Sequence, residues 1–151
     1  MTRGLIILAC LGATVAARPD RRIVDRVTVG DARNEQAHAY AGEGVATGVA
    51  KGLVFRQASS WMRYALTVFD DTEVTIACTF AGSDAPRTFD LVIENTVVTT
   101  YSFNSADSAT VELRVPIALT AGKTNILVML RANNGPTPPL LALRSVQDHN
   151  E

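Results

Sequence analysis

The chain has 151 residues, of which 47% are hydrophobic, and this size and composition predict one globular domain with a sizeable core. Its 14 Lys and Arg residues are balanced by 15 Asp and Glu residues, so the formal net charge is only -1. Proteins that grip phosphate backbones carry a basic excess, and the balance found here argues against a nucleic-acid partner.

Residues 1–17 are predicted to be a secretory signal peptide. Arg3 precedes an apolar run over residues 5–15, and the segment ends on small residues up to Ala17, where cleavage is expected. We therefore expect a secreted or periplasmic bacterial protein whose mature chain has no membrane span. One alternative is an uncleaved anchor, although the run is short against the roughly 20 apolar residues of a spanning helix. The other is a lipid attached to Cys10.

Residues 18–30 are expected to form a linker and the first strand, residues 31–147 a β-sandwich domain, and residues 148–151 a polar tail. Within the domain the hydrophobic period is two residues, with stops made of Gly, Pro, Asn and Asp, and no helical spacing is sustained. Residues 37–50, "AHAYAGEGVATGVA", interrupt this pattern, and we interpret them as a loop with brief extended pieces.

The segment "SSWMRYALTVF" holds the only tryptophan of the chain. Because successive side chains of a strand point to opposite faces, its residues divide into two sets. The inward set is Met62, Tyr64, Leu66 and Val68. Trp61 and Arg63 belong to the other set, so alternation places the indole outside the core. The alternative is a ring tucked under a neighbouring loop at the sandwich edge.

The later strands alternate in the same way. Their inward sets are Val74, Ile76, Cys78 and Phe80; Phe89, Leu91 and Ile93; Val111, Leu113 and Val115; and Ile126, Val128 and Leu130. "LLALRSV" is a short closing strand. Cys78 lies on an apolar side and is predicted to be a buried, inert thiol. About six or seven short strands without helical crossovers are typical of an all-β fold, an antiparallel β-sandwich or jelly roll.

No pattern of an active site stands out. Cys78, His38 and His149 lack the close spacing of a zinc site. The nucleophile elbow and the phosphate loop are absent, and "AGKTN" is interpreted as a turn because the upstream glycine is missing. Acidic residues are available for a glycosidase pair, but nothing in the sequence brings two of them together. We expect no enzyme and no cofactor, and leave open a calcium ion held by Asp side chains in a loop.

Several stretches, taken in order, resemble a known family. They are "VDRVTVGDARNEQAH", "FRQASSWMRYALTV", "AGSDAPRTFDLVIENTVV", "VPIALTAGKTNILVML" and "LALRSV". Over residues 25–146 the chain resembles the accessory substrate-binding β-sandwich of bacterial β-L-arabinofuranosidases of glycoside hydrolase families 127 and 146. The resemblance implies a fold like that of carbohydrate-binding modules and no catalytic residues, because those enzymes keep their zinc-binding cysteines and catalytic glutamate in a separate helical barrel. The chain departs from the family at Phe80-Ala81-Gly82, where an aromatic pair tends to precede the glycine.

Sugar chemistry then selects candidate residues. Sugars present apolar C–H faces to aromatic rings and hydroxyl groups to planar polar side chains. Trp61, with Arg63 beside it, meets that description. Glu35, His38 and Arg56 occupy recurring positions of the resemblance. They either hold a sugar hydroxyl or bond to one another and anchor the N-terminal segment against the sheet.

Arg87 and Asp90 are a further candidate pair, with a cross-strand ion pair between them as the alternative.

The favoured function is secreted, non-catalytic carbohydrate binding, with a plant-type or arabinose-containing polysaccharide and a glycoside hydrolase as expected partners. The second hypothesis is an interaction module that docks on an envelope protein or a glycoside hydrolase and binds no sugar itself. A small independent hydrolase is the third.

Overall fold

The computed structural model describes residues 21–148, which form nine strands, one α-helix and one 3₁₀ turn. The predicted signal peptide, Cys10 and His149 lie outside the described residues. In chain order the elements are β1 (Arg21–Thr28), α1 (Ala32–Ala37), β2 (Ala41–Ala50), β3 (Leu53–Thr67), β4 (Val74–Phe80), β5 (Arg87–Ile93), β6 (Thr96–Phe103), β7 (Ala109–Val115), η1 (Ile117–Leu119), β8 (Asn125–Ala132) and β9 (Leu140–Asp148).

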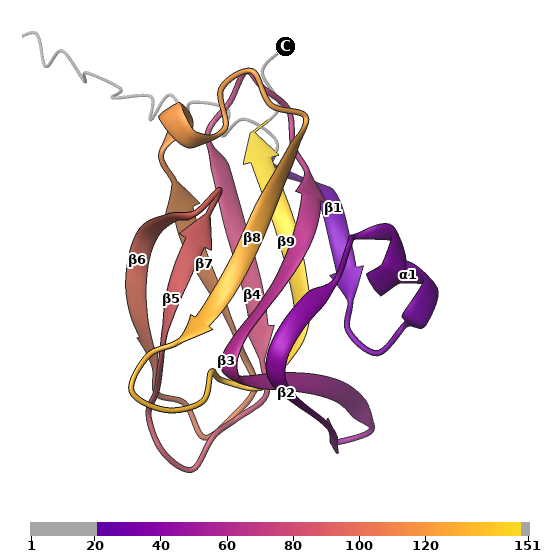
Figure 1. Cartoon of the computed structure of the whole chain (residues 1–151), viewed down its shortest axis with the longest axis vertical. Helices are drawn as coiled ribbons and strands as arrows, with labels where there is room; N and C mark the ends of the chain where they lie inside the picture. Colours follow the sequence, from indigo (N-terminus) through magenta and orange to yellow (C-terminus); the bar gives the residue numbers. More distant parts are fainter. Residues whose placement is uncertain (1–20, 149–151) are drawn as a thin grey trace, which may run out of the picture.

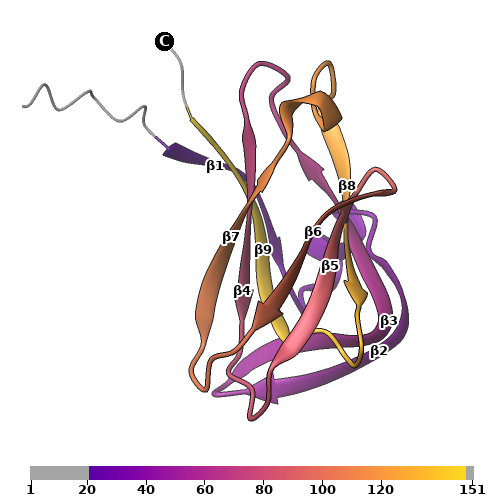
Figure 2. The ribbon, with the colours of Figure 1, turned by 90° about the vertical axis from the view of Figure 1, so that its left-hand side faces the viewer.

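The strands form two antiparallel layers that pack face to face (Figures 1 and 2). One layer has the order β2-β3-β8-β5-β6, and the other has the order β1-β9-β4-β7. A single pair, Arg56 of β3 with Leu140 of β9, joins the two layers at one corner. The predicted all-β antiparallel sandwich of jelly-roll type is confirmed.

The core lies between the two layers and contains the inward sets predicted from alternation. Met62, Tyr64 and Leu66 of β3 are fully buried, with 0% exposure. The other buried members are Val68, Val74, Ile76, Cys78, Phe80, Phe89, Leu91, Ile93, Val111, Leu113, Val115, Ile126, Val128 and Leu130. Burial raises the pKa of the Cys78 thiol to about 12, so this cysteine stays neutral and unreactive.

The interpretation of residues 37–50 as a loop was wrong. Residues 41–50 form β2, which pairs with β3 along its whole length except for a bulge between Glu43 and Val45. Small residues hide this strand from a hydrophobic pattern, because its order comes from backbone pairing with β3 and not from a buried face of its own.

The chain before β2 is also more ordered than expected. Residues 32–37 form α1, whose N-cap Asp31 accepts a bond from the Asn34 N–H at 3.1 Å.

The hairpin of β2 and β3 extends beyond the rest of its sheet, because β3 begins at Leu53 but pairs with β8 only from Trp61 to Thr67. Figure 2 shows both strands curving under the sandwich toward the layer of β9 and β4. The turn uses Lys51 and Gly52, both with positive φ, as the tight hairpin requires. None of the helices within residues 21–148 is long and apolar enough to cross a membrane.

Candidate functional site

Trp61 lies on the outer face of the layer that contains β3. Its neighbours Met62 and Tyr64 are fully buried, whereas the indole is half-buried. The predicted alternation is therefore confirmed, and the ring is not part of the core. Arg63, two residues along on the same face, places its guanidinium 5.5 Å from the centre of the indole ring. This is the distance of a cation–π contact.

Strand register places Trp61 in a line of five side chains across the sheet. Trp61 is opposite Glu43 of β2 on one side and Arg131 of β8 on the other. The line continues through Asp90 of β5 to Thr100 of β6. Directly opposed residues of antiparallel strands share one face, so these side chains all belong to the outer surface. We call this set the Trp61 row.

Asp90 holds two of its neighbours in the Trp61 row, Arg131 and Thr100, by hydrogen bonds. It is 7% exposed and accepts bonds from Arg131 Nη2 at 2.8 Å and Thr100 Oγ1 at 2.7 Å. Asn133 Nδ2 is a third donor, at 2.9 Å. The bonds from Asn133, Thr100 and Arg131 outweigh partial burial and lower the pKa of Asp90, which remains ionised. Arg131 is therefore held in place while its side chain stays 47% exposed.

The ion pair of Arg87 with Asp90, which was the alternative to a sugar-binding role for these two residues, does not form. Arg87 stands three positions before Asp90 on β5, so it points to the other face, at the end of the strand opposite Phe103. Its Nε atom is buried without a hydrogen-bond partner among the described residues. The cross-strand ion pair does exist, but the arginine is Arg131, which lies directly opposite Asp90.

Glu35 and Arg56 meet in a separate, buried cluster where α1 contacts the sheet. Glu35 is 3% exposed, and both of its oxygens accept bonds from Arg56, Nε at 2.7 Å and Nη2 at 2.9 Å. The Tyr64 hydroxyl donates to the same carboxylate at 2.8 Å, and the Gly30 N–H donates at 3.0 Å. Burial alone would raise the pKa of Glu35, but these bonds outweigh it and lower the pKa. The carboxylate has four protein donors, and Arg56 also lies over the Tyr40 ring at 4.6 Å.

His38 does not join that cluster and instead ties β1 to β3. Its Nε2 lies 2.8 Å from Asp25 Oδ1, and its Nδ1 lies 2.6 Å from the Asn34 carbonyl oxygen. Asp25 also accepts the Thr67 N–H at 2.8 Å. Burial disfavours the charged ring, but the bonds to Asp25 and Asn34 prevail and raise the pKa of His38. For Asp25, hydrogen bonds outweigh burial and lower the pKa.

The seven sequence candidates thus separate into four places, and the residues that complete these places were missed. Trp61, Arg63 and Asp90 share one outer face, joined by Glu43 and Arg131, which alternation alone could not select because it does not give the register between strands. Among residues 21–148 no group of three or more His, Cys, Asp or Glu side chains is placed to hold a metal ion.

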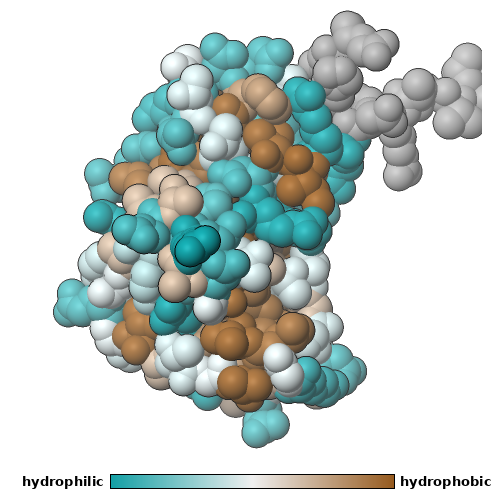
Figure 3. Space-filling model, turned by 90° about the vertical axis from the view of Figure 1, so that its right-hand side faces the viewer, coloured by the Kyte–Doolittle hydropathy of each residue, from teal (hydrophilic) through white to brown (hydrophobic). Residues whose placement is uncertain are grey.

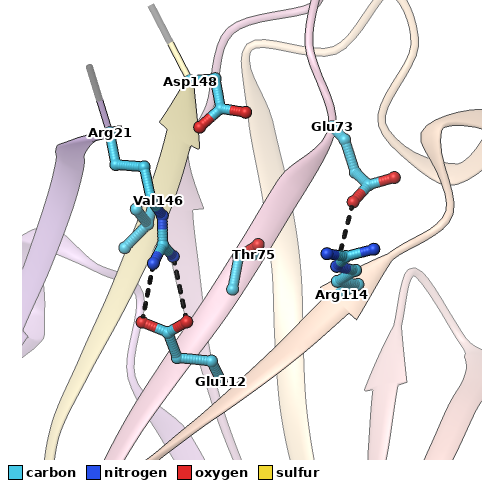
Figure 4. Close-up of a pocket in the computed structure, with 7 residues that line it drawn as sticks. All are labelled: Arg21, Glu73, Thr75, Glu112, Arg114, Val146 and Asp148. Carbon is cyan, nitrogen blue, oxygen red and sulfur yellow. Dashed lines mark hydrogen bonds and ion pairs between the residues drawn. The ribbon is translucent and has the colours of Figure 1, made fainter. Parts of the chain in front are cut away.

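A polar pocket of about 280 Å³ lies on the outer face of the opposite layer (Figure 4). Four of its five charged side chains form two pairs: Arg21 Nη2 is 3.1 Å from Glu112 Oε2, and Arg114 Nε is 3.7 Å from Glu73 Oε1. Both pairs are well exposed to solvent. Such surface pairs contribute little to stability, and they leave Asp148 as the one charged lining residue without a salt bridge within residues 21–148.

Comparison with known proteins assigns the chain to a family. A family model described as "Family of unknown function (DUF6805)" matches residues 19–144. The chain belongs to this DUF6805 family. No curated protein sequence matches it.

Solved structures with the same fold include carbohydrate-binding modules. A family 35 carbohydrate-binding module from Clostridium thermocellum is 10% identical with a TM-score of 0.62, over 81% of this chain and 98% of the module. The family 35 module of Cellvibrio japonicus Abf62 is 14% identical with a TM-score of 0.58, over 83% and 98%. A region of a family GH115 4-O-methyl-α-glucuronidase with specificity for decorated arabinogalactans is 10% identical with a TM-score of 0.58, over 87% of this DUF6805 chain and 18% of the enzyme. At these identities the likeness concerns the fold, which is that of a carbohydrate-binding module.

Proposed function

We propose that this DUF6805 chain is a secreted, non-catalytic module that binds a polysaccharide on the Trp61 row. The observation that carries the proposal is the half-buried indole on an outer sheet face, with the guanidinium of Arg63 at 5.5 Å. A flat aromatic surface stacks on the apolar face of a sugar ring. The exposed part of Arg131 and the carboxylate of Glu43, which flank Trp61 on either side, supply donors and an acceptor for hydroxyl groups.

The ligand class in this proposal is a plant-type or arabinose-containing polysaccharide. It rests on the sequence resemblance to the accessory domain of β-L-arabinofuranosidases of glycoside hydrolase families 127 and 146. The structural likeness to family 35 modules and to part of a GH115 enzyme supports the module fold. Secretion through residues 1–17 is part of the same proposal, and N-terminal sequencing of the exported protein should begin at residue 18.

Trp61 offers its own assay, because it is the only tryptophan of the chain. Titration with arabinan, arabinogalactan or pectic oligosaccharides should shift its emission for the ligand that binds. Trp61→Ala should weaken that ligand about tenfold or more in a gel-retardation or calorimetric assay, equivalent to about 1.4 kcal/mol. Because the indole is only partly exposed, Trp61→Ala also loses packing, and urea unfolding should establish that the variant is folded before its affinity is compared.

Phe69→Ala is the matched control. Phe69 is 40% exposed and also lies under an arginine, with Arg22 at 4.3 Å from its ring centre, but it is outside the Trp61 row. Its removal should leave glycan affinity unchanged. If no glycan alters the emission, and Trp61→Ala is retarded in glycan gels like the unmodified protein, the Trp61 row is not a sugar site.

A further inference from the structure

A second pocket, of about 350 Å³, lies between the β2–β3 hairpin and the outer face of the layer of β1, β9 and β4. Its floor carries Arg26 of β1 and Arg144 of β9, and its walls are aliphatic, with Val29, Leu53, Val54 and Leu141. The volume is in the range of specific binding sites. The pocket faces away from the Trp61 row, because the two belong to the outer faces of opposite layers.

Gly30 allows this pocket to form. A Cβ atom at this position would lie 2.7 Å from the Val54 side chain, so only glycine lets the curved hairpin close onto the end of β1. The φ of +89° at Gly30 also requires glycine. The position of the β2–β3 hairpin beside the pocket therefore depends on the glycine at position 30.

The two arginines of the floor are directly opposed. Arg26 and Arg144 are cross-strand partners of β1 and β9, an arrangement in which like charges repel. Along the same register the next charged residue is Glu112, which is engaged by Arg21 at 3.1 Å. Neither Arg26 nor Arg144 makes a salt bridge within residues 21–148, and the Nε atom of Arg144 is buried without a hydrogen-bond partner there. No carboxylate lines the pocket.

The walls argue for an aliphatic occupant. Leu53 at the hairpin tip is 58% exposed, and Val49 of β2, the cross-strand partner of Val54 but not itself a lining residue, is 68% exposed. Figure 3, which looks at the side of α1 and β1, shows a hydrophobic patch in the lower half of the molecule, below a belt of polar side chains. None of the residues that line the pocket is aromatic, so it lacks the stacking surface that a sugar ring would use.

We propose that this pocket docks an acidic, aliphatic peptide segment of a partner protein. A carboxylate of the segment would bind the paired guanidinium groups of Arg26 and Arg144, which are well suited to bidentate contacts. A neighbouring Leu, Ile or Val side chain would pack against Leu53, Val54 and Leu141. The module would then hold a glycan on one sheet and a protein on the other.

The test uses the full chain and a short fluorescein-labelled peptide of alternating Leu and Glu, compared with the same peptide carrying Gln in place of Glu. Fluorescence anisotropy should show tighter binding of the acidic peptide. Arg26→Gln and Arg144→Gln should each weaken it about tenfold, the effect of losing a charge-assisted hydrogen bond. Leu53→Ser should weaken both peptides, because it removes part of the aliphatic wall.

Matched controls separate this site from general charge attraction. Arg114→Gln removes an arginine that is 85% exposed on the same sheet, and Leu127→Ser removes a leucine that is 37% exposed on the other sheet. Both should bind the peptide like the unmodified protein. Trp61→Ala should also retain peptide binding, so failure of the glycan proposal and failure of this one are distinguishable.

NMR provides an independent readout, because the Nε–Hε resonance of Arg144 should shift when the acidic peptide is added. Equal binding of the Glu and Gln peptides, or unchanged binding by Arg144→Gln with a silent Arg144 resonance, would overturn the proposal. A response of the Arg144 resonance to trigalacturonate but not to the peptide would overturn it in favour of an acidic sugar.

Discussion

Glu35 and Asp90 are both carboxylates held by an arginine, and their surroundings give them different uses. Glu35 is 3% exposed, and its partner Arg56 continues to Thr47 Oγ1 at 2.8 Å and to the face of Tyr40. Asp90 is 7% exposed, but its partner Arg131 has a side chain that is 47% exposed beside Trp61. In the first region the carboxylate–arginine pair is surrounded by other protein groups, whereas in the second the guanidinium of Arg131 is presented to solvent.

The difference shows that a resemblance in sequence can select residues with a structural role and miss residues that form an exposed surface. Glu35 and Arg56 were selected by the sequence resemblance, and their contacts are with each other, with the side chains of Tyr64, Thr47 and Tyr40, and with the backbone. Such a cluster specifies how α1 docks onto the sheet. The Trp61 row is built from residues of five strands, and its exposed groups are available to a ligand. The comparison can be sharpened by removing a carboxylate from each region.

The largest effect is expected for Glu35→Ala. It would leave Arg56 and the Tyr64 hydroxyl without their acceptor, and removal of one partner from a buried ion pair costs about 3 to 5 kcal/mol. Urea unfolding should show this loss, with glycan affinity of the folded protein unchanged. Glu43→Ala, which removes an exposed glutamate, is the control and should unfold like the unmodified protein. A loss of glycan affinity with normal stability in Glu35→Ala would make this cluster a ligand site.

Asp90→Ala should have an intermediate effect on stability and a distinct effect on binding. Thr100 and Asn133 lose their shared acceptor, which is expected to cost about 1 to 3 kcal/mol. Arg131 loses its anchor beside Trp61, so glycan affinity should fall as well. Asp107→Ala, at an exposed turn, is the control for both measurements. Unchanged affinity in a folded Asp90→Ala protein would show that Arg131 takes no part in binding.

The smallest effect concerns the pH dependence of the His38 and Asp25 pair. The pKa of His38 is raised on folding, so its contribution is complete below its unfolded pKa of about 6.5 and is lost as the pH rises through the folded value. The pKa of Asp25 is lowered, so its contribution is complete above about 3.9 and is lost as the pH falls through its lower folded value. The pair therefore stabilises most between these limits.

His38→Gln should lose about 1 kcal/mol of unfolding free energy near the middle of that window and less above neutral pH. Chemical unfolding at several pH values measures this difference. Asp25→Asn should remove the same pH dependence, and the double variant should add little to either single one. A difference between His38→Gln and the unmodified protein that grows with rising pH would mean that the neutral ring is the stabilising form.

Much of the fold could be predicted because alternation is local. Met62 and Tyr64 face inward and Trp61 outward as soon as residues 59–69 are extended, whatever their neighbours are. The short α1 and the strand β2 were missed for the opposite reason. Their order depends on contacts with β3 and on the cap at Asp31, and a run of small residues carries no periodic signal.

The sequence by itself determined which alternating apolar side chains of β3, β4, β5, β7 and β8 the sandwich buries and that the single tryptophan lies on an outer face. Only the tertiary structure decided which residues meet. Arg131, and not Arg87, became the partner of Asp90, Arg26 came to oppose Arg144, and the β2–β3 hairpin closed onto β1 beside Gly30. The physical reason is that a two-residue period sets the face of a side chain, whereas its neighbours depend on the register and order of strands far apart in the chain.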